Sequence, residues 1–172
     1  MYIRQTRIED IDRLEEVFER AKEILKESDN FEQWGDNYPE RNLIEKDIKQ
    51  SQSYVVIRDE ENDSPVEPGE IVGTLMIQKT PDENYNNILK GAWLNDEPHV
   101  VIHRVASSNE MRGVGSYIFD YLTSTYSNIR IDTTEKNKPM LALLKKYGFK
   151  QCTVIDIGNS TRVGFQYLKE DS

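Results

Sequence analysis

At 172 residues, of which 37% are hydrophobic and 31% charged, the chain is long enough for one buried core and too short for two, which predicts a single domain over residues 1–172. Its net charge of −9 argues against nucleic-acid binding, and no apolar run approaches the roughly 20 residues of a membrane-spanning helix. The N-terminal segment lacks a signal-peptide core, so a cytoplasmic location is expected, and the lone Cys152 excludes an internal disulfide and a cysteine-built metal site.

The first part of the chain alternates between helix and strand patterns. Residues 2–6 alternate like a strand, and apolar residues then recur at helical spacing up to about Lys26. The polar segment 28–39 carries three aromatic side chains, which are costly to expose and therefore either cap the core or line a pocket. These are Phe31, Trp34 and Tyr38.

A second helix is predicted at residues 39–51 and strands at 53–58 and 70–80. The acidic segment 59–69 between those strands contains two prolines and ends in glycine, which is typical of a solvated hairpin loop. Residues 81–90 are expected to form a loop or a short helical turn.

The last part of the chain predicts a strand from residue 99, a helix after Gly115, a strand at 129–133 and a helix at 138–146. Two strands, 149–157 and 162–168, follow around a Gly-Asn turn. Cys152 lies on the first of these and is expected to be a buried core thiol. Strands and helices in this order predict a mixed α/β (α+β) fold with helices flanking a central twisted sheet.

The stretch 99–122 carries the strongest functional signal. Its apolar strand ends near Val105, and a polar loop with Gly113 and Gly115 leads into a helix. The first amides of a helix have no intrahelical acceptor and lie at the positive end of its dipole, so such a loop is suited to a phosphate or pyrophosphate. The loop lacks the Gly-Lys-Ser/Thr of a P-loop and the third glycine of a dinucleotide fingerprint.

This loop resembles the acetyl-coenzyme A loop of the GNAT superfamily of N-acetyltransferases, Q/R-x-x-G-x-G/A. Gly113, Gly115 and Ser116 fit that pattern, whereas Glu110 stands at its first position. Downstream, residues 137–149 (NKPMLALLKKYGF) resemble the family's N-x-x-A-x-x-L-Y-x-k-x-G-F block. The two blocks also have the order and separation found in the family.

The resemblance implies a mixed, mostly antiparallel sheet in which the strand ending at Val105 and the strand 129–133 run parallel and splay apart. It also implies acetyl-CoA as co-substrate, no metal, and transfer of the acetyl group to a primary amine of a small molecule or peptide in a ternary complex. A homodimer is a family expectation. The residues implied to contact the acetyl group, pyrophosphate and pantetheine are Val105, Ala106, Arg112, Gly113, Val114, Gly115, Ser116 and Asn137.

The reaction needs a base, because an amine must lose a proton from an ammonium whose pKa is about 10. His103, His99 and Glu97 are the candidates, together with Asp96, and a structural histidine or a loop cap is the alternative for each. Regular strand alternation would place both histidines on the same face as Val105.

Acceptor recognition is expected in the two aromatic and acidic loops. The hypothesis is that a cationic amine binds a cleft formed by Trp34, Tyr38, Trp93, Asp96 and Glu97.

Two positions depart from the family pattern. Leu144 stands where the family has a tyrosine that acts as general acid, and Tyr147, one turn later, either takes that role or packs at the helix end. Leu144 and Glu110 support an alternative function, a catalytically weak acyl-CoA-binding sensor or interaction module.

Overall fold

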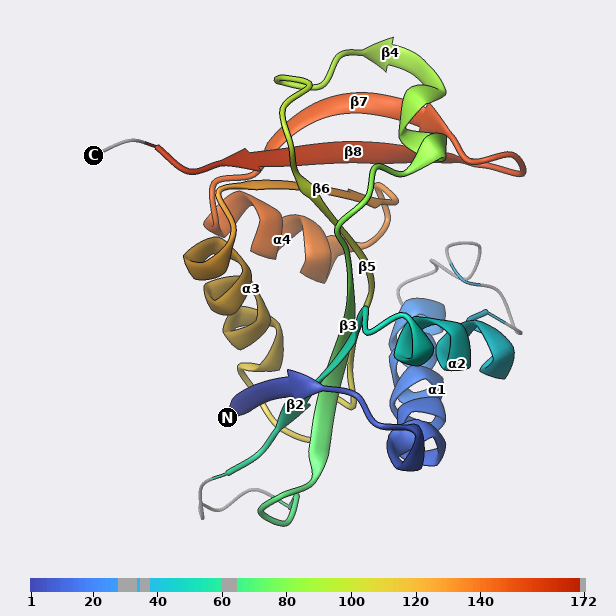
Figure 1. Cartoon of the computed structure of the whole chain (residues 1–172), viewed down its shortest axis with the longest axis vertical. Coiled ribbons are helices and arrows are strands. Elements are labelled where there is room, and N and C mark those ends of the chain that lie inside the picture. Colours follow the sequence, from blue (N-terminus) through green and yellow to red (C-terminus); the bar gives the residue numbers. More distant parts are fainter. Residues whose placement is uncertain (28–33, 35–37, 60–64, 171–172) are drawn as a thin grey trace. The chain divides into compact units, whose positions relative to one another are not determined.

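The computed structural model describes residues 1–27, 34, 38–59 and 65–170 (Figure 1). The chain forms two compact units, each with its own strands and helices. Unit 1 comprises Met1–Ile77 and Arg104–Ile118, and unit 2 comprises Gln78–His103 and Phe119–Ser172. The expectation of a single domain remains a prediction.

Unit 1 combines two amphipathic helices with antiparallel strands. Strand β1 (Tyr2–Gln5) pairs antiparallel with β2 (Ser53–Ile57), which pairs antiparallel with β3 (Ile71–Gln78). Beyond β3 the hydrogen-bonded order continues to β5 (Val100–Ser107), whose last four residues belong to this unit. A short 3₁₀ turn leads into helix α1 (Ile11–Glu27).

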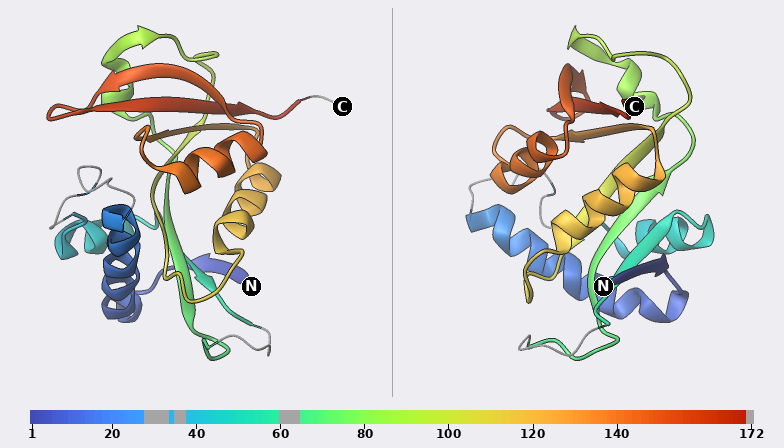
Figure 2. Two further views of the ribbon diagram at one scale, coloured as in Figure 1. Left: turned by 180° about the vertical axis from the view of Figure 1, so that it is seen from behind. Right: turned by 90° about the vertical axis from the view of Figure 1, so that its left-hand side faces the viewer.

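Helix α2 (Arg41–Lys49) lies beside α1, as both ribbon diagrams show (Figures 1 and 2). The apolar stripe of α1 and one side of α2 bury their side chains against the strands, and each large side chain buried this way stabilises the fold by about 1.5–3 kcal/mol. The buried cluster of unit 1 consists of Ile11, Leu14, Val17, Phe18, Ile44, Val55, Ile57, Ile71 and Ala106.

Unit 2 contains hydrogen-bonded strands in the order β5, β6, β8, β7 and β4, which are labelled in Figure 1. Strand β6 (Asn128–Thr133) pairs antiparallel with β8 (Thr161–Leu168), and β8 pairs antiparallel with β7 (Lys150–Asp156). Helix α4 (Lys138–Lys146) connects β6 to β7. Helix α3 (Val114–Thr125) begins in unit 1 and continues into unit 2 at Phe119.

The fold class agrees with the sequence prediction: the protein has a mixed α/β fold with a mixed, mostly antiparallel sheet flanked by helices. One strand was not predicted. Strand β4 (Ile88–Gly91) pairs with β7 in the segment expected to be loop or turn, although a short 3₁₀ helix, Glu83–Asn86, does precede it. All four residues of β4 are exposed, so this edge strand has no apolar alternation to mark it.

Strand β5 shows the expected parallel pairing and one unexpected backbone feature. It pairs in parallel with β6 from Val100↔Ile129 to Ile102↔Ile131. At Arg104 the backbone turns left-handed, with φ of 52°. Regular alternation therefore does not continue through Arg104, and the prediction that both histidines share a strand face with Val105, which assumed an unbroken strand, stays a prediction.

Candidate functional site

The glycine loop of unit 1 leads into helix α3 as predicted. Gly113 has φ of 86°, a conformation that favours glycine, and its carbonyl accepts the first helical hydrogen bond from the amide of Tyr117 at 2.9 Å. Arg112 and Gly113 are exposed, and a Cβ added to Gly113 would meet no atom within 4 Å. The start of α3 is therefore open at Gly113, while Val114, next in the chain, is buried.

Glu110, which departs from the family pattern, fixes this loop to helix α1. Its carboxylate accepts a hydrogen bond from Nη2 of Arg13 at 2.7 Å, and Arg13 also donates to the carbonyl of Ile71. Partial burial acts to raise the pKa of Glu110, but the hydrogen bond and positive charge of Arg13 outweigh it and hold that pKa below its usual range. Glu110 thus has a structural role in unit 1.

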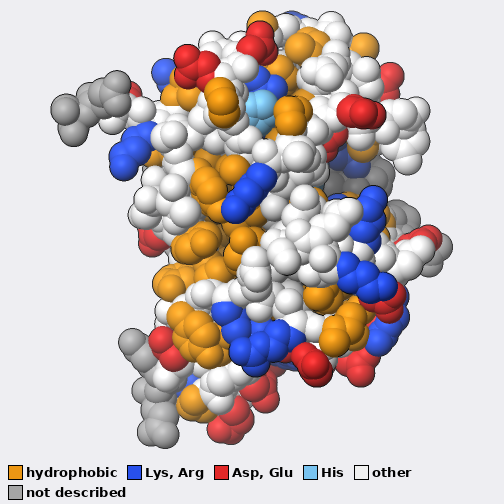
Figure 3. All heavy atoms as spheres, viewed as in Figure 1, with side chains coloured by type: hydrophobic (Ala, Val, Ile, Leu, Met, Phe, Trp, Pro, Cys, Tyr) orange, Lys and Arg blue, Asp and Glu red, His pale blue; other side chains and the backbone are white. Residues whose placement is uncertain are grey.

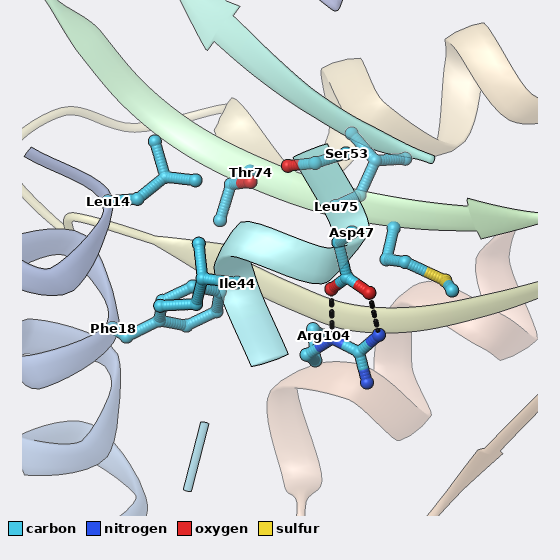
Figure 4. A pocket seen from close by; sticks show the side chains of 9 residues that line it. Leu14, Phe18, Ile44, Asp47, Ser53, Thr74, Leu75 and Arg104 are labelled. Atoms are coloured by element: carbon cyan, nitrogen blue, oxygen red, sulfur yellow. Dashed lines mark hydrogen bonds and ion pairs between the residues drawn. The ribbon is translucent and has the colours of Figure 1, made fainter. Parts of the chain in front are cut away.

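Next to the predicted acetyl-binding residues, Arg104 and Asp47 form a buried ion pair (Figure 4). Val105 is half-buried and Ala106 buried. A pocket beside the pair has space for about one water molecule, so it is too small for a substrate. It is lined by Leu14, Phe18, Ile44, Asp47, Ser53, Thr74, Leu75, Met76 and Arg104.

Of the predicted acceptor residues, Trp34 and Tyr38 are part of the packing of unit 1. Trp34 packs against the core cluster, with its ring 5.7 Å from that of Phe18 and 6.2 Å from that of Tyr38. The hydroxyl of Tyr38 accepts a hydrogen bond from Nη1 of Arg104 at 2.8 Å. These contacts favour the core-capping interpretation, and Phe31 lies outside the described residues.

In unit 2, His103 lies between two carboxylates. Its Nε2 is 2.7 Å from Oδ2 of Asp82, and its Nδ1 is 3.9 Å from Oδ1 of Asp132. The hydroxyl of Tyr85 donates to the same Oδ1 of Asp132 at 2.6 Å. Burial raises the pKa of Tyr85 well above its usual range, and the neighbouring Asp132 raises it further, so this hydroxyl stays a donor.

Asp82, Tyr85 and Asp132 were not identified from the sequence. Asp82 precedes the 3₁₀ helix and accepts a hydrogen bond from the amide of Asn84, as a helix-capping residue does. Asp132 is the one carboxylate of β6, whose other five residues are all buried, and an acidic residue in such a strand is the one signal that could have pointed to it.

The other predicted residues of this region have different environments. Trp93 stacks on Tyr85 with ring centroids 5.0 Å apart and lies beneath the guanidinium of Arg130. Asp96 and Glu97 are exposed, with Asp96 3.8 Å from Arg130. The structure brings Trp93, but not these two carboxylates, to the His103 cluster.

His99 hydrogen-bonds through Nδ1 to the carbonyl of Glu97 at 2.9 Å. A carbonyl only accepts, so Nδ1 carries the proton and Nε2 is left as an acceptor in the neutral ring. Nε2 is buried and has no hydrogen-bond partner within the described part of the chain.

Three further residues singled out in the sequence lie in or next to α4, and the structure defines the surroundings of each. The side chain of Asn137 caps α4 by accepting from the amide of Met140 at 3.3 Å. The hydroxyl of Tyr147 donates to Asp120 at 2.8 Å, and its ring stacks on Phe119. Leu144 is fully buried.

Cys152 is half-buried rather than a full core residue, because it lies on β7 near the edge strand β4. Burial raises the pKa of its thiol, which disfavours the thiolate form that acts as a nucleophile.

On the face shown in Figure 3, lysine and arginine side chains lie beside aspartates and glutamates, and hydrophobic side chains lie among them. Within the ranges described, no helix combines the length and apolar character needed to span a bilayer. The same residues contain no group of three or more His, Cys, Asp or Glu side chains arranged to hold a metal ion.

Comparison with known proteins agrees with this fold. A GNAT-family acetyltransferase from Streptococcus agalactiae is 27% identical with a TM-score of 0.83, over 99% of this chain and 96% of that chain. A Staphylococcus aureus protein is also 27% identical, with a TM-score of 0.65, over 98% of this chain and 99% of that one. A GNAT-family acetyltransferase from Listeria monocytogenes, at 20% identity and a TM-score of 0.67, matches over 98% of this chain and 94% of that chain and supports the fold alone.

No curated protein sequence matched the chain. The model of the acetyltransferase (GNAT) family, however, matches residues 12–149, which is most of its length. The chain therefore belongs to the GNAT family of acetyltransferases.

Proposed function

We propose that this protein transfers the acetyl group of acetyl-CoA to a primary amine of a small molecule or peptide. Family membership supports acetyl transfer in general. The observation that supports the proposal is the open glycine turn at Gly113 in front of α3, because helix starts with an accessible backbone are common binding sites for phosphate groups.

The residues present fit the CoA pyrophosphate. The start of α3 supplies amides and the positive end of a helix dipole, and the exposed Arg112 adds a positive charge. Gly113 leaves room for phosphate oxygens to approach the backbone. In this proposal residues 112–116 hold the pyrophosphate, the end of β5 at Val105 and Ala106 contacts the acetyl group, and Asn137 contacts pantetheine. When bound, acetyl-CoA supplies the activated thioester.

His103 is the proposed general base. An ammonium must lose a proton before its nitrogen can attack the thioester carbon, and histidine has an unperturbed pKa, about 6.5, suited to this task. His103 is partly exposed, and its ring is oriented by a hydrogen bond to Asp82. Glu97 and His99 are the alternative bases.

The leaving thiolate needs no dedicated acid, because a thiol with a pKa near 8.5 is a good leaving group. Leu144, at the position of the family's tyrosine, is buried. Tyr147 is engaged with Asp120. We infer that the proton reaches sulfur from the reacting nitrogen or from water.

The direct test measures release of free thiol from acetyl-CoA with a panel of primary amines. Amine-dependent release with formation of the N-acetylated product is the expected result. CoA binding without release for any amine would instead favour an acyl-CoA sensor or interaction module, and absence of CoA binding would contradict both.

A further inference from the structure

The two carboxylates around His103 come from separate elements and contact opposite sides of its ring. Asp82 precedes the 3₁₀ helix Glu83–Asn86 and approaches Nε2, whereas Asp132 on β6 approaches Nδ1. All three side chains are largely but not fully buried, with 16–19% of each exposed.

The Asp82 contact fixes the tautomer of His103. An ionised carboxylate has only acceptors, so at 2.7 Å the Nε2 atom must carry the hydrogen. In the neutral ring the lone pair is then on Nδ1, on the side of Asp132. Because the hydrogen bond to Asp82 favours this tautomer, the neutral His103 ring has its lone pair on the nitrogen that would accept the proton.

The distance between Nδ1 of His103 and Oδ1 of Asp132 is compatible with one ammonium nitrogen that contacts both atoms. A separation of 3.9 Å is too long for a direct hydrogen bond, but one nitrogen can lie roughly 2.8 Å from both atoms, because the sum of the two bonds exceeds the separation. Tyr85 donates to the same oxygen of Asp132 and holds the carboxylate in place. Arg130, also on β6, is engaged with the ring of Trp93 and the carbonyl of Asn95.

We propose that Asp132, oriented by Tyr85, binds the ammonium of a cationic acceptor, and that Asp82 holds His103 with Nδ1 ready to take its proton. This inference rests on the proposed acetyltransferase function. One proton passes from the ammonium to Nδ1, the freed nitrogen forms a bond to the acetyl carbon, and the carbon–sulfur bond breaks. The second proton of the nitrogen goes to the thiolate, and the imidazolium releases its own to solvent.

The acceptor class follows from this arrangement. Asp82 and Asp132 contribute two negative charges beside His103, and Arg130, a permanent positive charge, lies over the ring of Trp93. A primary amine that is protonated at neutral pH can pair with the carboxylate of Asp132, and the stacked rings of Tyr85 and Trp93 supply an apolar wall beside it. Amines that are neutral at pH 7 gain neither the ion pair nor the proton transfer.

The tautomer is tested by nitrogen-15 NMR of the two histidine rings, with His99→Gln used for assignment. In the neutral protein, His103 is expected to carry its proton on Nε2, and Asp82→Asn should reduce that preference. Glu83→Gln removes a neighbouring exposed carboxylate and should change nothing. A proton on Nδ1 in the native protein would overturn the proposal, whether or not an acceptor has been found.

The kinetic test compares benzylamine, which is cationic at pH 7, with aniline, which is neutral. Asp82→Asn should lower kcat for benzylamine roughly tenfold or more, and Asp132→Asn should raise its KM by a similar factor, with KM for acetyl-CoA unchanged. Both variants should affect aniline much less. Glu135→Gln, an exposed carboxylate just after β6, is the control for Asp132.

Equal losses with both acceptors would show that the carboxylates are only structural and would overturn the proposal. Absence of thiol release with every amine would contradict the proposed function instead. In that case the NMR measurement still decides whether Asp82 orients His103.

Discussion

Arg104 and Asp47 form a bidentate ion pair within unit 1. Nε and Nη2 of the guanidinium donate to the two carboxylate oxygens at 2.7 and 2.8 Å, and only 10% and 8% of the two side chains are exposed. Arg104 is also the β5 residue with φ of 52°, a conformation that costs a non-glycine residue roughly 1–3 kcal/mol. The ion pair therefore ties α2 to a strained point directly before Val105.

Asp47→Asn should destabilise the protein strongly, because it leaves the Arg104 charge buried without its partner. Loss of one member of a buried pair costs about 3–5 kcal/mol in the free energy of unfolding. Urea unfolding checks this. Asp12→Asn, which removes an exposed ion pair with Arg41, is the control and should have little effect. If the two variants unfolded at the same urea concentration, the ion pair would have no special structural role.

Gly113→Asp should weaken CoA binding more than tenfold, about 1.4 kcal/mol, because it places a negative charge where the pyrophosphate is proposed to bind. Calorimetry on the folded variant measures this. Gly113→Asn has nearly the same shape and tolerates positive φ but adds no charge, so it separates charge from bulk. Gly69→Asp, at another open glycine with positive φ, controls for strain. Equal CoA affinity of the Asp variant and the native protein would contradict the proposed pyrophosphate site.

Glu110 should contribute to stability in a pH-dependent way. Its pKa in the folded protein lies below the unfolded value of about 4.3, so its contribution is present above about pH 4.3 and is lost as the pH falls through the folded pKa. Glu110→Gln should therefore lower the melting temperature at pH 7, and the difference from the native protein should shrink towards pH 3.

Melting curves from pH 3 to pH 7 measure this effect. Glu23→Gln, at an exposed position of α1, should show no such trend. A difference between Glu110→Gln and the native protein that did not depend on pH would show that the Arg13 contact does not shift the ionisation of Glu110.

Long periodic elements could be predicted from the sequence because their apolar pattern reflects burial. Helix α1 and the sequence from β5 through the glycine loop to α3 are examples. Strand β4 has no such pattern, because it lies exposed at an edge and is defined by its hydrogen bonds to β7. The left-handed backbone conformation at Arg104 could not be predicted from the sequence either, because it occurs at a residue other than glycine.

The residues of the candidate site also differ in how far the sequence could predict them. The glycine loop has a local sequence signature, whereas the partners of His103 lie 21 and 29 positions away and meet it only through tertiary structure. Glu110 shows the reverse case: its departure from the family pattern is visible in the sequence, but its ion pair with Arg13 is not.

Trp34→Ala should distinguish the two interpretations of the aromatic loop. Trp34 contacts Phe18 and Tyr38 and packs on the core of unit 1, so its loss should cost at least about 1 kcal/mol of stability. Thermal melting and the KM of the acceptor are measured on the same variant. A lower melting temperature with an unchanged KM supports core capping, whereas a raised KM at unchanged stability would place Trp34 in the acceptor site.

His103→Gln should lower kcat roughly 10²-fold or more, the usual contribution of one general base, while the fold and CoA affinity change little. The acidic limb of the pH–rate profile should disappear, because protonation of His103 is what removes the base as the pH falls. His99→Gln is the comparison variant, because its ring contacts the Glu97 carbonyl rather than the two aspartates, and a similar loss of kcat in this variant alone would identify His99 as the base. If His103→Gln kept a near-native kcat and an unaltered profile, His103 would not be the base and Glu97 would be the next residue to test. If it lost stability but kept the shape of the profile, the ring would serve only to join β5 to Asp82.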